Sequence, residues 1–274
     1  MAQTILDRIL ADVRTEVDAA KYRRSAADLR SRIADRRGPL SLPDAISSEF
    51  GLIAEIKEKS PSVGRMREEN VARAADVYEG SGRVRAVSVL TNFTHFGMSI
   101  ERLAEVREIV TKPILRKDFI IEEYQIREAR AFGADAILLM ASVLDGPQLK
   151  GFYDLTRELG MQALFEVHSP EEIQALPPDA LVVGINSRKF KTTEGFSGAN
   201  QDSTRDFSVD LGAFALADQL PAGTLRVAES GISVETIAGV TKTFHAALVG
   251  TSLLRDERGI EPAVRAFEEA IISA

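Results

Sequence analysis

The chain has 274 residues, of which 45% are hydrophobic and 27% charged, and its formal net charge is −7. These values are typical of a globular protein with its own core, and the negative balance argues against general attraction to nucleic acid or an anionic membrane. Because the chain has no cysteine and only three histidines, it cannot form disulfides, thiolate nucleophiles or Fe–S clusters, and a His-rich metal site is not expected.

The first 48 residues precede any predicted strand and have the pattern of helices. Apolar side chains recur there every four positions, as on one helix face: Ile5, Ile9, Val13 and Val17. We expect residues 1–48 to form a helical extension packed on residues 49–274, so that the chain is one domain. This stretch lacks the apolar core of a signal peptide, and no segment approaches membrane-spanning length, which favours a cytoplasmic location.

Eight short apolar segments rich in β-branched residues follow along the chain. Their ranges are 52–57, 85–90, 113–118, 135–140, 163–167, 181–186, 225–230 and 246–250. Helical spacing follows each of them, as in 69–82, where four side chains fall on one face: Val71, Ala74, Ala75 and Tyr78. Continuously apolar strands that alternate with helices are typical of a parallel sheet buried on both sides. Eight such units predict an α/β protein, a closed (β/α)₈ TIM barrel with an N-terminal helical extension, in preference to an open doubly wound sheet.

A long connection is predicted after the sixth strand. Residues 194–208 are rich in Gly, Ser, Asn and Asp and show no periodicity, which is typical of a loop. Because this loop would follow a strand directly, it should lie at the barrel mouth. We expect it to act as a mobile flap that affects substrate entry or product release and not the chemical step.

Polar and ionisable residues gather at the predicted carboxyl ends of the strands, where barrel enzymes carry their catalytic groups. They are Glu55, Lys57, Lys117, Glu166, Asn186, Arg188, Glu229 and Ser230. Any one of them alone is as consistent with a solvent-exposed loop residue as with a catalytic residue. Five strands that all end in this way indicate side chains that face one another and shift each other's pKa values, as general acid–base chemistry requires.

Small residues follow the seventh and eighth strands, at Ser230-Gly231 and Gly250-Thr251-Ser252. Barrels hold a phosphate at this place, where backbone N–H groups and the start of a short helix point at the anion. Residues 252–255 could form that helix, and ordinary tight turns are the alternative. His168, just past the fifth strand, is expected to have a structural role.

Seven segments of the chain resemble the indole-3-glycerol phosphate synthase family. They are IAEIKEKSPSVG (53–64), VSVLTNFTHFGMS (87–99), PILRKDFIIEEYQIREARAFGADAILL (113–139), LFEVHSPEE (164–172), VGINSRKFKT (183–192), VAESGI (227–232) and LVGTSLLR (248–255). Members of that family close the pyrrole ring of 1-(2-carboxyphenylamino)-1-deoxyribulose 5-phosphate with loss of CO₂ and water. The resemblance therefore implies a carboxy-lyase of tryptophan biosynthesis. It implies no metal or cofactor, because decarboxylation restores the aromatic ring without an electron sink.

The same resemblance implies roles for the catalytic residues. Lys117 would be the general acid that protonates the ribulose carbonyl, and Glu166 the acid/base partner in the later dehydration. Lys57 would bind the substrate carboxylate and take part in proton transfer. Four further residues would orient these groups and the sugar hydroxyls: Glu55, Asn186, Glu229 and Ser230.

The resemblance also implies a site for an anionic, anthranilate-derived substrate. Ser60 and Arg188 would hold its anionic ends, while Phe119 and Leu138 would form walls for the anthranilate ring. The phosphate would lie at the small residues after the last two strands: Gly231, Gly250, Thr251 and Ser252. No nucleic acid or membrane is expected as a partner, and the protein is expected to be a monomer or a weak homo-oligomer.

Two positions depart from the usual family pattern, and two other functions remain open. Asn92 stands where the family usually has an acidic residue, and Met98 replaces the first residue of its usual Gly-Ser pair. One alternative is another ribulose-phosphate-type barrel enzyme, such as the sister isomerase, whose chemistry typically pairs a Cys with an Asp. The other is a catalytically silent barrel kept as a partner subunit, against which the intact Lys57, Lys117 and Glu166 speak.

Overall fold

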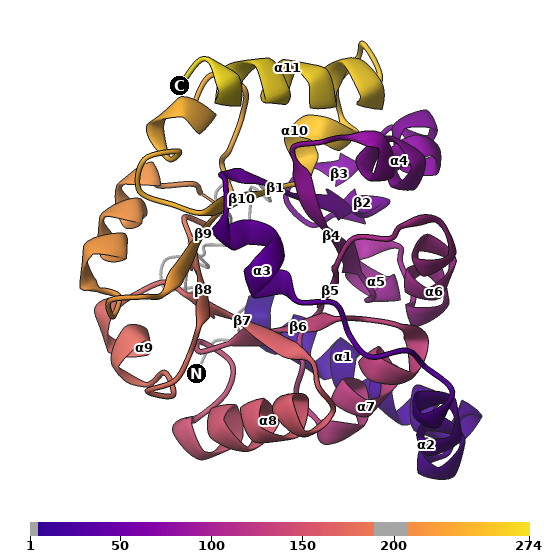
Figure 1. Ribbon diagram of the computed structural model, residues 1–274. Coiled ribbons are helices and arrows are strands. Elements are labelled where there is room, and N and C mark those ends of the chain that lie inside the picture. Colours follow the sequence, from indigo (N-terminus) through magenta and orange to yellow (C-terminus); the bar gives the residue numbers. More distant parts are fainter. Residues whose placement is uncertain (1–4, 189–207) are drawn as a thin grey trace, which may run out of the picture.

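Eight parallel strands close into a barrel in the computed structural model, which describes residues 5–188 and 208–274 (Figure 1). The strands are β1 (Gly51–Ile56), β4 (Val84–Leu90), β5 (Ile114–Lys117), β6 (Ala136–Met140), β7 (Gln162–Val167), β8 (Val182–Asn186), β9 (Leu225–Glu229) and β10 (Ala246–Val249). Neighbours along this list pair in parallel, and β1 closes the ring on β10, with Gly51 opposite Ala246. The predicted TIM barrel is confirmed, and each predicted strand lies within one residue of its observed bounds.

At least one helix follows each barrel strand. These helices are α4 (Glu68–Gly80), α5 (Phe93–Phe96), α6 (Ile100–Ile109), α7 (Glu123–Phe132), α8 (Gly146–Glu158), α9 (Pro170–Gln174), the 3₁₀ helices η2 (Leu211–Gln219) and η3 (Ile237–Gly239), α10 (Thr251–Leu254) and α11 (Ile260–Ile272). The predicted apolar face of α4 is buried, and the short helix predicted over 252–255 forms one residue earlier as α10. Side-chain caps fix several helix starts; for example, Ser99 accepts a hydrogen bond at the start of α6 and Asp145 at the start of α8.

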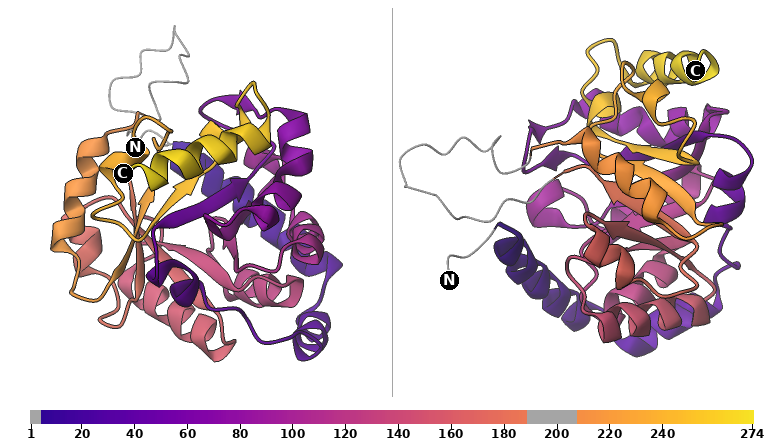
Figure 2. Two further views of the ribbon diagram at one scale, coloured as in Figure 1. Left: turned by 45° about the horizontal axis from the view of Figure 1, so that its top comes forward. Right: turned by 90° about the vertical axis from the view of Figure 1, so that its left-hand side faces the viewer.

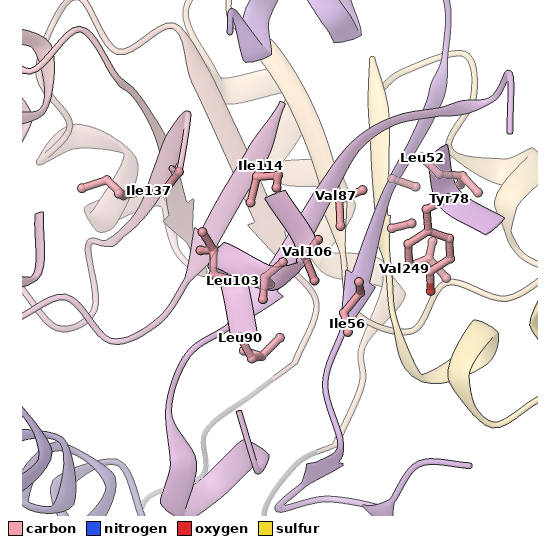
Figure 3. Close-up of a cluster of buried hydrophobic side chains, with 14 of the residues drawn as sticks. Leu52, Ile56, Tyr78, Val87, Leu90, Leu103, Val106, Ile114, Ile137 and Val249 are labelled. Atoms are coloured by element: carbon pink, nitrogen blue, oxygen red, sulfur yellow. The ribbon is translucent and has the colours of Figure 1, made fainter. Parts of the chain in front are cut away.

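Strand alternation divides the apolar residues into two layers. In β1, Leu52 and Ile56 point outward, where they pack with α4 and α6 side chains such as Tyr78 and Leu103 (Figure 3). Ile53, between them, points inward and packs with the inward residues of the other strands. Because side chains alternate with period two, the outward and inward positions of every strand follow from one another.

Three helices precede the barrel: α1 (Ile5–Arg23), α2 (Ala26–Ala34) and α3 (Leu42–Ser47). Leu42 and Ile46 of α3 plug the amino end of the barrel, and the Leu42 N–H donates to Gln162 at the start of β7 (Figure 1). α1 lies at the opposite end, where its Ile9 reaches the inner layer (Figure 2). The segment before β1 thus closes the amino end of the barrel interior and contributes one apolar side chain at the carboxyl end. The division into an extension and a barrel at residue 48 stays a prediction.

A short antiparallel hairpin, β2 (Lys59–Ser60) and β3 (Gly64–Arg65), follows β1 and was not predicted. Gly64, the first residue of β3, has a φ of 74°, a conformation that favours glycine where the turn enters the second strand. The loop predicted over 194–208 lies outside the described residues, apart from Ser208. No helix in the described ranges is long and apolar enough to span a membrane.

Candidate active site

The carboxyl ends of the strands surround a cavity of about 320 Å³. All the residues that the sequence proposed for the site line it: Glu55, Lys57, Ser60, Lys117, Phe119, Leu138, Glu166, Asn186, Arg188, Glu229, Ser230, Gly231, Gly250, Thr251 and Ser252. Further lining residues were not predicted, among them Ile9, Ser62, Phe96, Asp118, Met140 and Ile232. The structure therefore brings together side chains from the strand ends, the β2–β3 hairpin and α1.

Alternation along the strands explains which charged residues enter the cavity. In β5, Leu115 points inward, so Lys117 two residues later does as well. Arg116, one residue apart, points outward and is buried among Thr91, Asp118 and Glu128, to which its guanidinium donates hydrogen bonds. Two neighbouring cations on one strand thus have different surroundings. Lys117 faces the cavity, and Arg116 forms buried hydrogen bonds outside the barrel.

Lys117 lies between two buried carboxyl groups. Its Nζ is 3.3 Å from Glu166 Oε2 on β7 and 3.5 Å from Glu229 Oε2 on β9. Both glutamate side chains are only 1% exposed. One ammonium therefore faces two carboxyls that are buried from water, where a charged group is stable only next to an opposite charge or a hydrogen-bond partner.

This arrangement shifts the three pKa values in different directions. Burial disfavours charge on Lys117, but the surrounding carboxyls Glu166, Glu229 and Glu55 outweigh it and raise its pKa. Burial and the negative charge of Glu166 raise the pKa of Glu229 to about 8. Burial also opposes charge on Glu166, yet Lys117 and His168 lower its pKa below the usual value. At neutral pH the site thus holds an ammonium, one carboxylate and one neutral carboxyl.

A second ion pair lies at the end of β1. The Lys57 ammonium donates a hydrogen bond to Glu55, whose backbone oxygen accepts one from the Tyr78 hydroxyl at 3.2 Å. Burial opposes ionisation of Glu55, but Lys57 and Lys117 lower its pKa. Glu55 is therefore ionised at neutral pH and holds the Lys57 ammonium at the cavity.

The turns after β9 and β10 face the same cavity. Ser230 and Gly231 have φ values of 66° and 68°, and among the described residues Ser230 is the non-glycine residue with a positive φ. The Ser252 hydroxyl donates to the Ile232 carbonyl oxygen at 2.7 Å, which joins the two turns. The Thr251 and Ser252 N–H groups stand in the first turn of α10, where helix geometry leaves backbone donors without a partner in the helix.

Apolar side chains form the remaining walls. Leu138 and Met140 of β6 and Phe119 after β5 are buried there, beside Phe96 of α5 and Ile9 of α1. Their shared apolar surface suits a flat aromatic group. The amphipathic pattern of α1 predicted that Ile9 is buried but could not place it at the cavity.

Two residues support the site without lining the cavity: His168, for which the sequence predicted a structural role, and Gly184, which was not predicted. His168 does not line the cavity; its Nε2 lies 3.6 Å from Glu166 Oε1 and its Nδ1 3.3 Å from Glu172. Burial lowers the His168 pKa, but Glu172 and Glu166 outweigh it and raise that pKa. The second residue is Gly184 on β8, whose missing side chain leaves room for the Glu229 carboxyl. The contact of His168 with Glu166 is consistent with the structural role expected for it, whereas the sequence gave no signal for Gly184.

Comparison with known proteins assigns the chain to one family model, described as indole-3-glycerol phosphate synthase, over residues 6–266. A curated relative of that name from Kineococcus radiotolerans is 40% identical, with 93% of this chain and 91% of the relative covered. Another from Mycobacteroides abscessus is 39% identical, with 93% and 92% covered. Among solved structures, 3-hexulose-6-phosphate synthase from Salmonella typhimurium has a TM-score of 0.59 at 12% identity, covering 81% of this chain and 99% of that one. That likeness concerns the fold alone.

Proposed function

Since the chain belongs to the indole-3-glycerol phosphate synthase family and is a decarboxylating lyase of tryptophan biosynthesis, we propose which of its residues carry out each step. The substrate is 1-(2-carboxyphenylamino)-1-deoxyribulose 5-phosphate. The observation that carries the assignment is the Lys117 ammonium, held between Glu166 and Glu229 inside the cavity.

Lys117 acts in ring closure. The ring carbon that bears the carboxylate attacks the ribulose ketone, and negative charge develops on the ketone oxygen. Lys117 is protonated at neutral pH, because the carboxyls around it raise its pKa. It stabilises the developing charge and delivers a proton to that oxygen from a side chain that is only 16% exposed.

Decarboxylation follows from the product of ring closure. The intermediate carries a cationic ring with the carboxylate still attached, and loss of CO₂ returns the electron pair to the ring. Lys57, already paired with Glu55, binds the carboxylate until it leaves. No electron-sink cofactor or metal is needed for this step.

Dehydration completes the indole. A proton leaves the carbon next to nitrogen, the hydroxyl gains a proton and leaves as water, and a C=C bond forms. Glu166 is the acid/base group of this step: its lowered pKa keeps it ionised, so it takes the proton from carbon and then returns it to the leaving hydroxyl. Asn186, Ser230 and the carboxyls of Glu55 and Glu229 orient these groups and the sugar hydroxyls.

The remaining residues hold the two ends of the substrate. Phe119 and Leu138 pack on the anthranilate ring, while Ser60 and Arg188 bind anionic groups. The phosphate lies at the turns after β9 and β10: Gly231, Gly250, Thr251 and Ser252. Burial lowers the pKa of Arg188, yet an arginine remains charged at neutral pH, so it can still pair with an anion.

The test is production of indole-3-glycerol phosphate from this substrate by the purified protein, followed by the fluorescence of the indole product. Turnover that depends on Lys117 is expected. A different ribulose-phosphate-type reaction would consume another sugar phosphate and give no indole, and a catalytically silent barrel would bind the substrate without converting it. The absence of a cofactor, a cytoplasmic location and a monomeric or weakly oligomeric state stay predictions.

A further inference from the structure

Gly184 lies on β8, between the two strands that carry Glu166 and Glu229. In the β7–β8 register Gly184 is opposite Glu166, and in the β8–β9 register Asn186 is opposite Glu229. Gly184 has the same strand parity as Val182 and Asn186, so it faces the barrel interior. A side chain at this position would project onto the Glu229 carboxyl.

The Glu229 carboxyl occupies the space directly beside Gly184. A Cβ atom on Gly184 would lie 1.9 Å from Glu229 Oε1 and 3.0 Å from its carboxyl carbon. No other residue type could keep both its own Cβ and the present position of this carboxyl. The Glu229 carboxyl can therefore occupy this position only because Gly184, on the neighbouring strand, has no side chain.

The two carboxyls beside Lys117 have unequal surroundings. Glu166 accepts a hydrogen bond from Lys117 at 3.3 Å and has His168 at 3.6 Å on its other oxygen. For Glu229 the ammonium is 3.5 Å away, and its carboxyl lies close enough to that of Glu166 for the two to share a hydrogen bond, which needs a proton on one of them. Lys117 and His168 stabilise the charge on Glu166, so a negative charge is less stable on Glu229 than on Glu166. The negative charge therefore stays on Glu166 and the proton on Glu229.

We propose that Gly184 is a positioning residue that seats Glu229 beside Glu166, so that the enzyme begins its cycle with Glu229 protonated and Glu166 ionised. The proposal rests on the function given above, in which Lys117 is the general acid. With Glu229 neutral, Lys117 and Glu166 together carry no net charge. A second carboxylate would hold the Lys117 proton more tightly and repel the anionic substrate, so ionisation of Glu229 should slow the reaction.

Charged groups on the other elements agree with this distribution. Glu229 faces Glu55 from β1, Lys117 from β5 and Glu166 from β7, and burial together with Glu166 raises its pKa. His168 reaches the cluster through Glu166. Arg188, after β8, faces the carboxylates of Glu55 and Glu166. The balance of negative groups around Glu229 thus favours its neutral form.

The decisive variant is Gly184→Ala. The new methyl would collide with the far end of a flexible side chain and not with backbone, so the barrel should fold while the Glu229 carboxyl moves away from Glu166. Its pKa should then fall, since the nearby negative charge helps to raise it. The alkaline limb of the pH profile of kcat/KM should shift to lower pH by about one unit or more. For a shift of about one unit, single-turnover rates should fall about twofold at pH 7 and about tenfold at pH 9.

Gly151→Ala is the matched control. Gly151 lies on α8, and a Cβ there would meet no atom within 4 Å. This variant should keep the wild-type pH profile. A folded Gly184→Ala protein with the wild-type pH profile would overturn the proposal.

A measurement without substrate separates this proposal from the assigned reaction. The infrared carbonyl band of a protonated carboxyl should be present in the ligand-free protein at pH 7 and should decrease in both Glu229→Gln and Gly184→Ala. The difference from wild type is the quantity to compare, because burial also raises the pKa of Asp118. A band unchanged in Glu229→Gln would refute the proposal even if Gly184→Ala did not fold. If the band behaves as expected but wild type makes no indole product, the assigned reaction fails and the protonation of Glu229 stands.

Discussion

Gly250 and Glu55 fit together across the closing pair of strands: a Cβ on Gly250 would lie 2.2 Å from Glu55 Oε1 and 3.0 Å from Glu55 Cβ. Gly250 was assigned to phosphate binding from the sequence alone. The structure adds a steric reason for glycine here, because a larger residue would displace a carboxylate of the cavity.

Gly250→Ala should therefore lower kcat and not only raise KM. Glu55 Cβ, which is tied to the backbone, cannot swing away, so we also expect a loss of about 1–3 kcal/mol of unfolding free energy. Steady-state kinetics and chemical unfolding measure the two effects, and affinity for inorganic phosphate checks the phosphate site separately. A variant with normal kcat and weakened phosphate binding would show that Gly250 serves the anion alone.

Lys117→Ala should abolish ring closure while the protein still binds substrate. A general acid contributes roughly 10²–10⁴ in rate, so single-turnover formation of the indole product should fall by at least this factor. Lys150→Ala is the control, since Lys150 is an exposed lysine on α8 that pairs with Asp154 on the same helix. Near-normal turnover of Lys117→Ala would remove Lys117 from the chemistry.

Stability should decrease with rising pH because of Glu229. Its folded pKa of about 8 lies above the ordinary value near 4.3, so between these pH values the folded state binds the proton more strongly. This contribution is complete below pH 4 and is lost as the pH rises to about 8. His168, whose pKa is also raised, acts in the same direction above its ordinary value.

Glu229→Gln should make that dependence shallower, by about 1.4 kcal/mol per pH unit for the one proton removed. Urea unfolding at a series of pH values between 5 and 8 measures the slope. An unchanged slope in Glu229→Gln would mean that Glu229 titrates in the same way in the folded and unfolded chains.

Asn92→Asp should destabilise the protein through α1. Asn92 Oδ1 caps α5 by accepting from the His95 N–H at 2.8 Å, while its Nδ2 donates to Glu16 of α1 at 3.1 Å. An aspartate could cap α5 but would place a second carboxylate against Glu16. We expect a loss of about 1–3 kcal/mol in unfolding free energy.

Glu16→Gln in the Asn92→Asp background should recover part of that loss, because it removes one of the two facing negative charges. Asp18→Asn is the control for charge on α1, since the Asp18 side chain is exposed and pairs with Lys21 on the same helix. If the double variant were no more stable than Asn92→Asp alone, residues 16 and 92 would not be coupled.

The sequence predicted what depends on periodicity within one segment. Strand bounds, the α4 face and the cluster of polar strand ends all follow from local alternation, and these predictions are confirmed in position. Side chains that meet across strands were not predictable in this way: Gly184 beside Glu229 and Gly250 beside Glu55 depend on register between separate segments. Met98 illustrates the same limit, since its departure from the family pattern is accommodated by burial in the outer layer.

The closure of β1 on β10 also has a consequence for synthesis of the chain. β1 leaves the ribosome early, yet one edge of it stays unpaired until β10, near the other end of the sequence, has been made. In the same way, the hydrogen bonds of Glu16 on α1 can form only after residues 92–94 have been made, so α1 cannot dock on the barrel before then. During that interval an apolar strand edge is open to other chains. Yield of the folded protein should therefore depend on chain concentration and on holding chaperones more strongly than its native stability would suggest.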